Sequence, residues 1–94
     1  MQFLELVRFK VGGTLIRLTS STGHEVMRDG TWVRLSILEL REIIGRDADA
    51  ALSVAVINSV QLHRGDADKI KAHFLSMLRL PEYRALGFVD VTLN

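Results

Sequence analysis

The chain has 94 residues, 48% of them hydrophobic, and its 12 basic and 11 acidic side chains give a formal net charge of +1. This length fits a single domain, and the apolar content excludes an intrinsically disordered chain. The balanced charge gives no support to nucleic-acid binding, and the lack of cysteine excludes disulfides, thiolate metal sites and thiol nucleophiles.

The first part of the chain has the pattern of a β-meander. Residues 2–10, QFLELVRFK, alternate imperfectly and carry apolar side chains on both sides, which is typical of a strand covered on both faces. Gly12-Gly13 is a hairpin signal before a return strand over 14–20, and the Arg-Asp-Gly at 28–30 precedes an alternating stretch at 31–38. The start has no basic leader, and no apolar run reaches the ~20 residues of a membrane span, so we expect neither a signal peptide nor membrane insertion.

Residues 35–44, LSILELREII, are compatible with two structures. Their Leu, Glu and Arg content favours a helix, with Ile37, Leu40 and Ile44 at helical spacing. As a strand, the alternation changes phase after Ile37, where a β-bulge would lie. The residues alone leave both possibilities open.

Three further elements complete the predicted α+β fold. Residues 50–60, AALSVAVINSV, are rich in β-branched side chains and uncharged, which predicts a central strand. The apolar period then becomes helical, and Asp66 as N-cap and Pro81 as terminator predict an amphipathic helix over 66–79. Alternation returns in 87–94, GFVDVTLN, and predicts a closing C-terminal strand.

Residues able to carry catalysis or bind a metal are present, but their spacing is not that of a known site. The three histidines fit neither an HxxxH nor an HExxH motif: His24, His63 and His73. The Asp-x-Asp pairs at 47–49 and 66–68 suit turns and helix starts, and Gly12-Gly13 lacks the rest of a phosphate-binding loop. We therefore predict no catalytic residue, no metal site, no cofactor and no enzymatic activity.

Two stretches contain residue types that are enriched at protein interfaces. Trp32, the single tryptophan, is either a core residue with a satisfied indole N–H or an interface anchor. In LRLPEYRALGF, residues 78–88, the side chains of Tyr83, Arg84 and Phe88 serve either an interface or a helix-to-strand connection. We take Trp32, Tyr83, Arg84 and Phe88 as candidate interface residues.

The order of these stretches resembles a family of tailed-phage structural proteins. VGGTLIRLTSSTGHEV, then GTWVRLSILELREIIGRDADAALSVAVINS, then LPEYRALGFVDVTL, is similar to the N-terminal domain of phage minor tail and tail-hub proteins and of gene transfer agent baseplate components. The resemblance covers residues 3–93 and lies in strand order and turn positions. Larger members carry a further region, in some of them with cysteines that hold an iron–sulfur cluster, and this sequence has no cysteine.

The resemblance implies a single tail-tube-like domain over 1–94, a mainly antiparallel β-sandwich or half-barrel with one flanking helix, and it favours strand for 35–44. It implies a non-enzymatic virion component, made in the host cytoplasm, that forms a homo-oligomeric ring or docks on other tail and baseplate proteins. The strand edges at 2–10 and 86–93 would make these contacts. The alternative is a small phage-encoded or bacterial regulatory binding protein, for example an inhibitor of a host defence complex.

Overall fold

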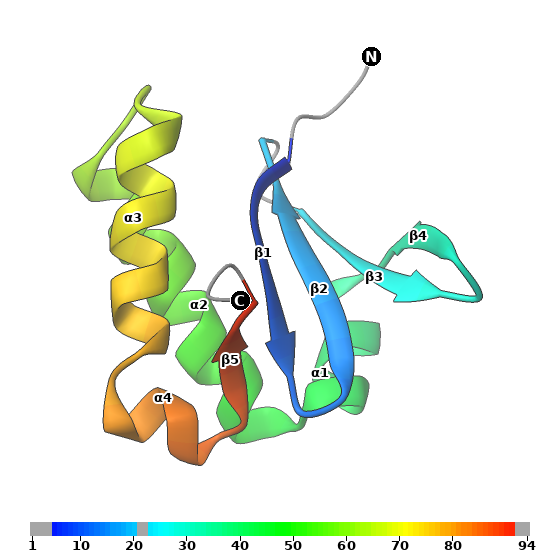
Figure 1. Cartoon of the computed structure of the whole chain (residues 1–94). Helices are drawn as coiled ribbons and strands as arrows, with labels where there is room; N and C mark the ends of the chain where they lie inside the picture. Colours follow the sequence, from blue (N-terminus) through cyan, green and yellow to red (C-terminus); the bar gives the residue numbers. More distant parts are fainter. Residues whose placement is uncertain (1–4, 21–22, 92–94) are drawn as a thin grey trace.

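The computed structural model describes residues 5–20 and 23–91, which form an α+β fold (Figure 1). The strands are β1 (Glu5–Val11), β2 (Thr14–Thr19), β3 (His24–Arg28), β4 (Thr31–Arg34) and β5 (Phe88–Asp90). The helices are α1 (Ile37–Ile44), α2 (Arg46–Leu62), α3 (Ala67–Leu78) and α4 (Pro81–Ala85). The strands make one antiparallel sheet with the order β4-β3-β2-β1-β5.

Two tight turns build the predicted meander. Gly12 has a φ of +59° in the turn between β1 and β2, and the ladder begins beside it with Val11 opposite Thr14. Asp29 and Gly30 both have positive φ, 50° and 78°, in the turn between β3 and β4. A hairpin turn of this kind needs positive φ at both central residues, which Asp-Gly supplies.

The closing strand is also confirmed, and it lies at one edge of the sheet. β5 pairs with β1 from Phe9–Asp90 to Val11–Phe88, while β4 forms the opposite edge. β1 is therefore an inner strand along Phe9–Val11, so this part of the predicted edge at 2–10 is already paired. Residues 2–4, 92 and 93 of the two predicted edges lie outside the described residues.

The core lies between one face of the sheet and the helices. Alternate strand residues face this layer and are buried: Val7, Phe9, Val11, Ile16, Leu18 and Val26. Figure 1 shows α2 and α3 side by side, with α4 leading from α3 into β5. Phe9 is at the centre, with ring centroids 5.2 Å from Phe74 of α3 and 6.2 Å from Phe88 of β5.

The predicted helix over 66–79 is confirmed as α3. Its N-cap is Asp66, whose Oδ1 accepts a hydrogen bond from the backbone N–H of Lys69 at 3.1 Å. α3 ends at Leu78, shortly before Pro81 as predicted. Pro81 is itself the first residue of the short helix α4. Arg79 donates to Oδ2 of the buried Asp90 carboxylate and so ties the end of α3 to β5.

The predicted strands over 35–44 and 50–60 are wrong, because both segments are helical. Ser36 and Glu39 form a capping box at α1: the Glu39 N–H donates to Ser36 Oγ, and the Ser36 N–H donates to Glu39 Oε1. Residues 50–60 lie within α2, where the buried side chains recur at helical spacing: Ala48, Leu52, Ala55, Val56 and Ser59. Burial of this stripe overrides the β-branched composition.

These corrections change the architecture from the one that the resemblance implies. The described residues contain one antiparallel sheet and four helices, where a β-sandwich or half-barrel with a single flanking helix was expected. The helices occupy the place that a second sheet takes in a sandwich.

Candidate docking surface

The sheet face that points away from the helices is the strongest candidate site, and we call it the open face. The strand pleat and the ladder register place on it Arg8, Lys10, Leu15, Arg17, Glu25, Met27, Trp32 and Val89. The residues between them in sequence, such as Phe9 and Ile16, point into the core. The same strands thus provide a dry apolar face and a mixed polar and aromatic face.

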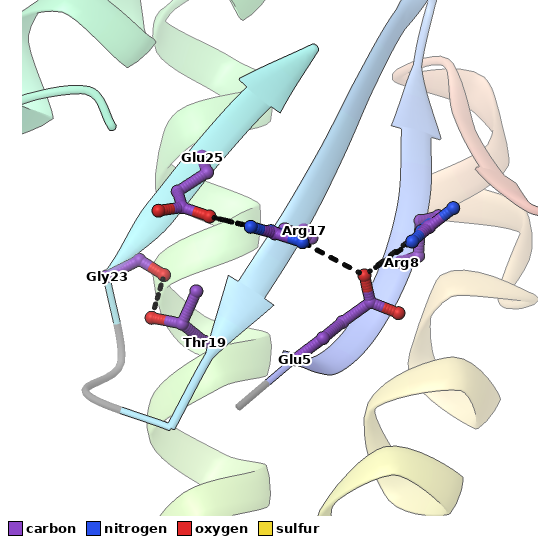
Figure 2. A network of polar contacts seen from close by, with 6 residues as sticks. All are labelled: Glu5, Arg8, Arg17, Thr19, Gly23 and Glu25. Carbon is purple, nitrogen blue, oxygen red and sulfur yellow. Dashed lines mark hydrogen bonds and ion pairs between the residues drawn. The ribbon is translucent and has the colours of Figure 1, made fainter. Parts of the chain in front are cut away.

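A network of charges crosses the open face from β3 to β1 (Figure 2). Arg17 donates through Nε to Glu25 Oε1 at 2.6 Å, and its Nη1 lies 3.8 Å from Glu5 Oε1. Arg8 Nη2 donates to the same Glu5 oxygen at 2.8 Å. Arg8 and Arg17 are direct cross-strand partners, and two like charges so placed repel each other. The two glutamates offset this repulsion.

Trp32 lies beside the two arginines of this network. The Arg17 Cζ atom is 4.3 Å from the centre of the indole ring, and the Arg8 Cζ atom is 5.1 Å from it. Because Trp32 is on β4 and the arginines are on β2 and β1, the indole must lean across β3 to reach them. Cation–π attraction at these distances favours this position of the ring, which is half-buried.

The arrangement of Trp32 and the arginines has the properties of a binding hot spot. Tryptophan and arginine are the side chains most enriched among residues that dominate binding energy. A ring already held in place loses little conformational entropy when a partner packs on it. The open face thus presents a half-buried aromatic side chain beside paired charges.

The other predicted interface residues lie elsewhere. Tyr83 is buried between α4 and α2, and its hydroxyl donates to the Ala51 carbonyl at 2.8 Å. Burial, with a smaller contribution from Glu82, raises the pKa of Tyr83. Phe88 is buried in the core against Phe9, so within this chain neither ring is available to a partner.

Arg84 is exposed, and it lines a small hollow of about 140 Å³ beside β5. The same hollow is lined by Arg79 and Asp90, which already pair with each other. The structure therefore does not bring Arg84 together with Trp32 in one site.

A second, larger hollow of about 450 Å³ lies where the start of β3 and the end of β4 meet α1 and α2. Its polar lining includes His24, Arg34 and Asp49, and Asp49 Oδ2 accepts from Arg41 Nε at 3.2 Å. Nε2 of His24 is buried and makes no hydrogen bond within the described part of the chain. Burial lowers the pKa of His24; the Asp49 carboxylate opposes this shift and Arg34 adds to it.

Sequence patterns did not reveal either site. His24 and Asp49 are far apart in the chain and come together only in the fold, where both line the 450 Å³ hollow. The contact between Trp32 and Arg17 depends on the register across three strands. In both cases the residue types were visible, but their proximity was not.

Two classes of site find no support in the described part of the chain, a metal centre and a membrane-spanning helix. Within residues 5–20 and 23–91, no cluster of three or more His, Asp or Glu side chains is arranged to hold a metal ion. The described helices include none that is long and apolar enough to span a membrane. No family model, no curated protein and no solved structure matches this chain.

Proposed function

We propose that this chain is a non-enzymatic docking subunit, a structural component of a tailed-phage virion at the tail tip, baseplate or hub. It binds a neighbouring tail protein through the open face. The observation that carries the proposal is the half-buried Trp32 ring, held against Arg8 and Arg17 on the side of the sheet opposite the helices.

The chemistry of the open face supports a protein partner. Glu5 and Glu25 already neutralise Arg8 and Arg17, so burying the network under a partner does not require that partner to supply carboxylates. Leu15, Met27 and Val89 add apolar side chains to the same face, and Met27 is the cross-strand partner of Trp32. A mixture of aromatic, apolar and paired charged side chains is typical of interfaces between subunits.

Under this proposal, the expected β-sandwich forms between two subunits and not within one chain. One sheet of this chain, packed by its open face on the sheet of a neighbour, forms a two-layer β arrangement between subunits. In this interpretation the tail-tube-like sandwich or half-barrel is a property of the assembly, and the helices of this chain cover its outer side. A ring of identical subunits requires a head-to-tail contact between different surfaces, because a face packed on the same face of a second copy closes after two subunits.

The test is incorporation into particles. A tagged copy of the chain is expressed in cells that produce the virions, and purified particles are analysed by quantitative mass spectrometry. We expect the wild-type chain at a fixed copy number and Trp32→Ala reduced by about tenfold or more, because loss of an interface anchor removes about 2 kcal/mol or more.

Leu80→Ala is the matched control, because Leu80 is an exposed apolar side chain between α3 and α4, outside the open face. We expect its incorporation to equal that of the wild type. Normal incorporation of Trp32→Ala would show that the open face is not the contact.

The alternative is a regulatory binding protein, which would use the same Trp32 surface on a host protein. The particle experiment separates the two functions. A wild-type chain that is absent from purified virions, but that enriches one host complex in a manner dependent on Trp32, would overturn the virion proposal and support the regulator.

A further inference from the structure

Helix α2 carries two stripes on opposite sides. The buried stripe packs in the core of this chain, with Ala48, Leu52, Ala55 and Ser59 spaced by four, three and four residues. The second stripe, which we call the outer seam, is spaced by three, four, three and four residues: Asp47, Ala50, Val54, Ile57 and Gln61. All five outer-seam residues are exposed, Val54 by 51% and Ile57 by 52%.

The spacing of the outer seam is that of the contact positions in a coiled coil, where residues repeat every 3.5 positions. Its composition is unusual for a helix face in water, because no charged side chain occurs from Ala50 to Leu62. The exposed faces of the other two long helices differ. α1 exposes Glu39, Arg41 and Glu42, and α3 exposes Asp68, Lys69 and Lys71.

We propose that the outer seam is a self-association site, where α2 packs antiparallel on α2 of a second copy of this chain. The two-fold axis crosses the outer seam at the height along α2 that lies midway between Ala55 and Val56. This axis places Val54 opposite Ile57 of the second copy. In the same register Ala50 faces Gln61 of the second copy. Both pairs occur twice, as a symmetric interface requires.

Charge complementarity at the ends of the seam favours this partner and this register. The same axis sets Asp47, in the first turn of α2, opposite Arg64 of the second copy, which lies just after its α2. The dimer contains two such ion pairs, one at each end of the outer seam. Antiparallel packing also places the positive N-terminus of each helix dipole beside the negative C-terminus of the other.

The surroundings of the seam add apolar surface for the second copy. Ile37, 72% exposed at the start of α1, lines the 450 Å³ hollow together with Ile57, Ser53 and Leu40. This surface therefore combines protruding side chains with a recess beside them. A two-fold contact buries such a surface against itself.

The open face does not suit a second copy in the same way. Glu5 and Glu25 already pair there with Arg8 and Arg17, so among the described residues the open face of a second copy offers no further carboxylate for the exposed Lys10. Self-association through α2 is thus independent of the proposed docking through Trp32. A dimer joined at the outer seam leaves the open faces of both copies available.

The test compares Val54→Asp with Val89→Asp on the full chain. The two valines have nearly equal exposure, 51% and 52%, but Val89 is on the open face. Analytical ultracentrifugation over a series of micromolar concentrations measures the monomer–dimer equilibrium. We expect Val54→Asp to raise the dimer dissociation constant by about a hundredfold or more. The substitution is present in both copies, and each copy is expected to raise the constant by about tenfold.

We expect Val89→Asp to leave the dimer unchanged. A wild-type chain that stays monomeric at all concentrations overturns the proposal, as does a loss of dimer caused by Val89→Asp and not by Val54→Asp. Circular dichroism melting shows that each variant is folded, and Ile57→Lys serves as a second seam variant if Val54→Asp does not fold.

A charge exchange tests the register. Asp47→Arg and Arg64→Asp should each weaken the dimer, because each sets like charges opposite one another at both ends of the seam. The double variant should restore it. Failure of the double variant to recover dimerisation would overturn the antiparallel register, and incorporation of Val54→Asp into particles remains a separate measure of docking through Trp32.

Discussion

The two faces of the sheet are made by the same strands, yet they differ in almost every physical property. On the covered face, Phe9 and Ile16 are fully buried under the helices. On the open face their sequence neighbours Arg8 and Arg17 remain partly exposed, bonded to glutamates and lying against Trp32. One residue step along a strand therefore moves from the face that stabilises the fold to the face that we propose as the docking surface.

This division has an energetic consequence. Apolar burial contributes about 25 cal/mol per Å², whereas exposed ion pairs contribute about 0–1 kcal/mol each. The covered face must therefore provide most of the stability of a small domain. The open face can carry charges and a half-buried aromatic ring because the fold does not depend on them.

The sharpest test of this difference uses two adjacent residues. Phe9→Ala should lower the free energy of unfolding by about 3–5 kcal/mol, because it leaves a cavity among Phe74 and Phe88. Arg8→Ala, one position earlier, should lower it by less than about 1 kcal/mol. Urea unfolding followed by circular dichroism measures both. Similar losses for the two variants would contradict the division between the faces.

A second prediction concerns the helical layer above the covered face. Tyr83→Phe keeps the ring that packs on Phe88 but removes the hydroxyl that donates to the Ala51 carbonyl. We expect a loss of about 1 kcal/mol in the free energy of unfolding, the usual contribution of one such bond. Arg84→Lys, at the exposed neighbouring position, should change stability by less than about 0.5 kcal/mol. A loss for Arg84→Lys as large as that for Tyr83→Phe would be evidence against this role of the hydroxyl.

The elements that sequence patterns predicted are those fixed by local chemistry. Asp29-Gly30 supplies the two positive φ angles of its hairpin, and Asp66 caps α3 with its own side chain. Such signals act within a few residues, so they can be recognised without knowledge of the rest of the fold.

The elements that differ from the sequence prediction depend on packing in α2 and on a side-chain cap at the start of α1. Ser36 and Glu39 have the spacing of a capping box, which marks the start of α1 in the sequence. In α2 the β-branched residues favour a strand, but Leu52 and Ala55 are buried at helical spacing against the sheet and α3. The cluster around Trp32 could not be predicted, because it requires the register of β1, β2 and β4.

A third prediction measures the coupling within the open face. A double-mutant cycle with Arg17→Met and Trp32→Leu should give an interaction energy of about 0.5–1 kcal/mol, the contribution of a cation–π contact at a partly exposed site. Urea unfolding of the four proteins provides the values. The same cycle between Lys10 and Trp32, for which no such contact is observed, is the control. A coupling of zero at Arg17 would mean that the ring is not held in place by this arginine.

The smallest effect is expected at the margin of the covered face, where His24 lines the hollow beside α2. Burial lowers the pKa of His24 in the folded protein below its usual value of 6.5, more than the Asp49 carboxylate raises it. As the pH falls below 6.5, the unfolded chain therefore binds a proton before the folded chain does. The contribution of His24 to the free energy of unfolding is therefore largest above pH 6.5, and it declines as the pH falls toward the folded-state pKa of His24.

Glutamine at this position does not titrate, so His24→Gln isolates this contribution. The difference in free energy of unfolding between wild type and variant should be constant above pH 6.5 and should shift against the wild type as the pH falls below that value. Urea unfolding at a series of pH values measures it, and acidic residues common to both proteins cancel in the difference. Parallel curves would show that the His24 imidazole is as well solvated in the folded protein as in the unfolded chain. In that case the margin of the covered face would resemble the open face, where polar side chains keep contact with water.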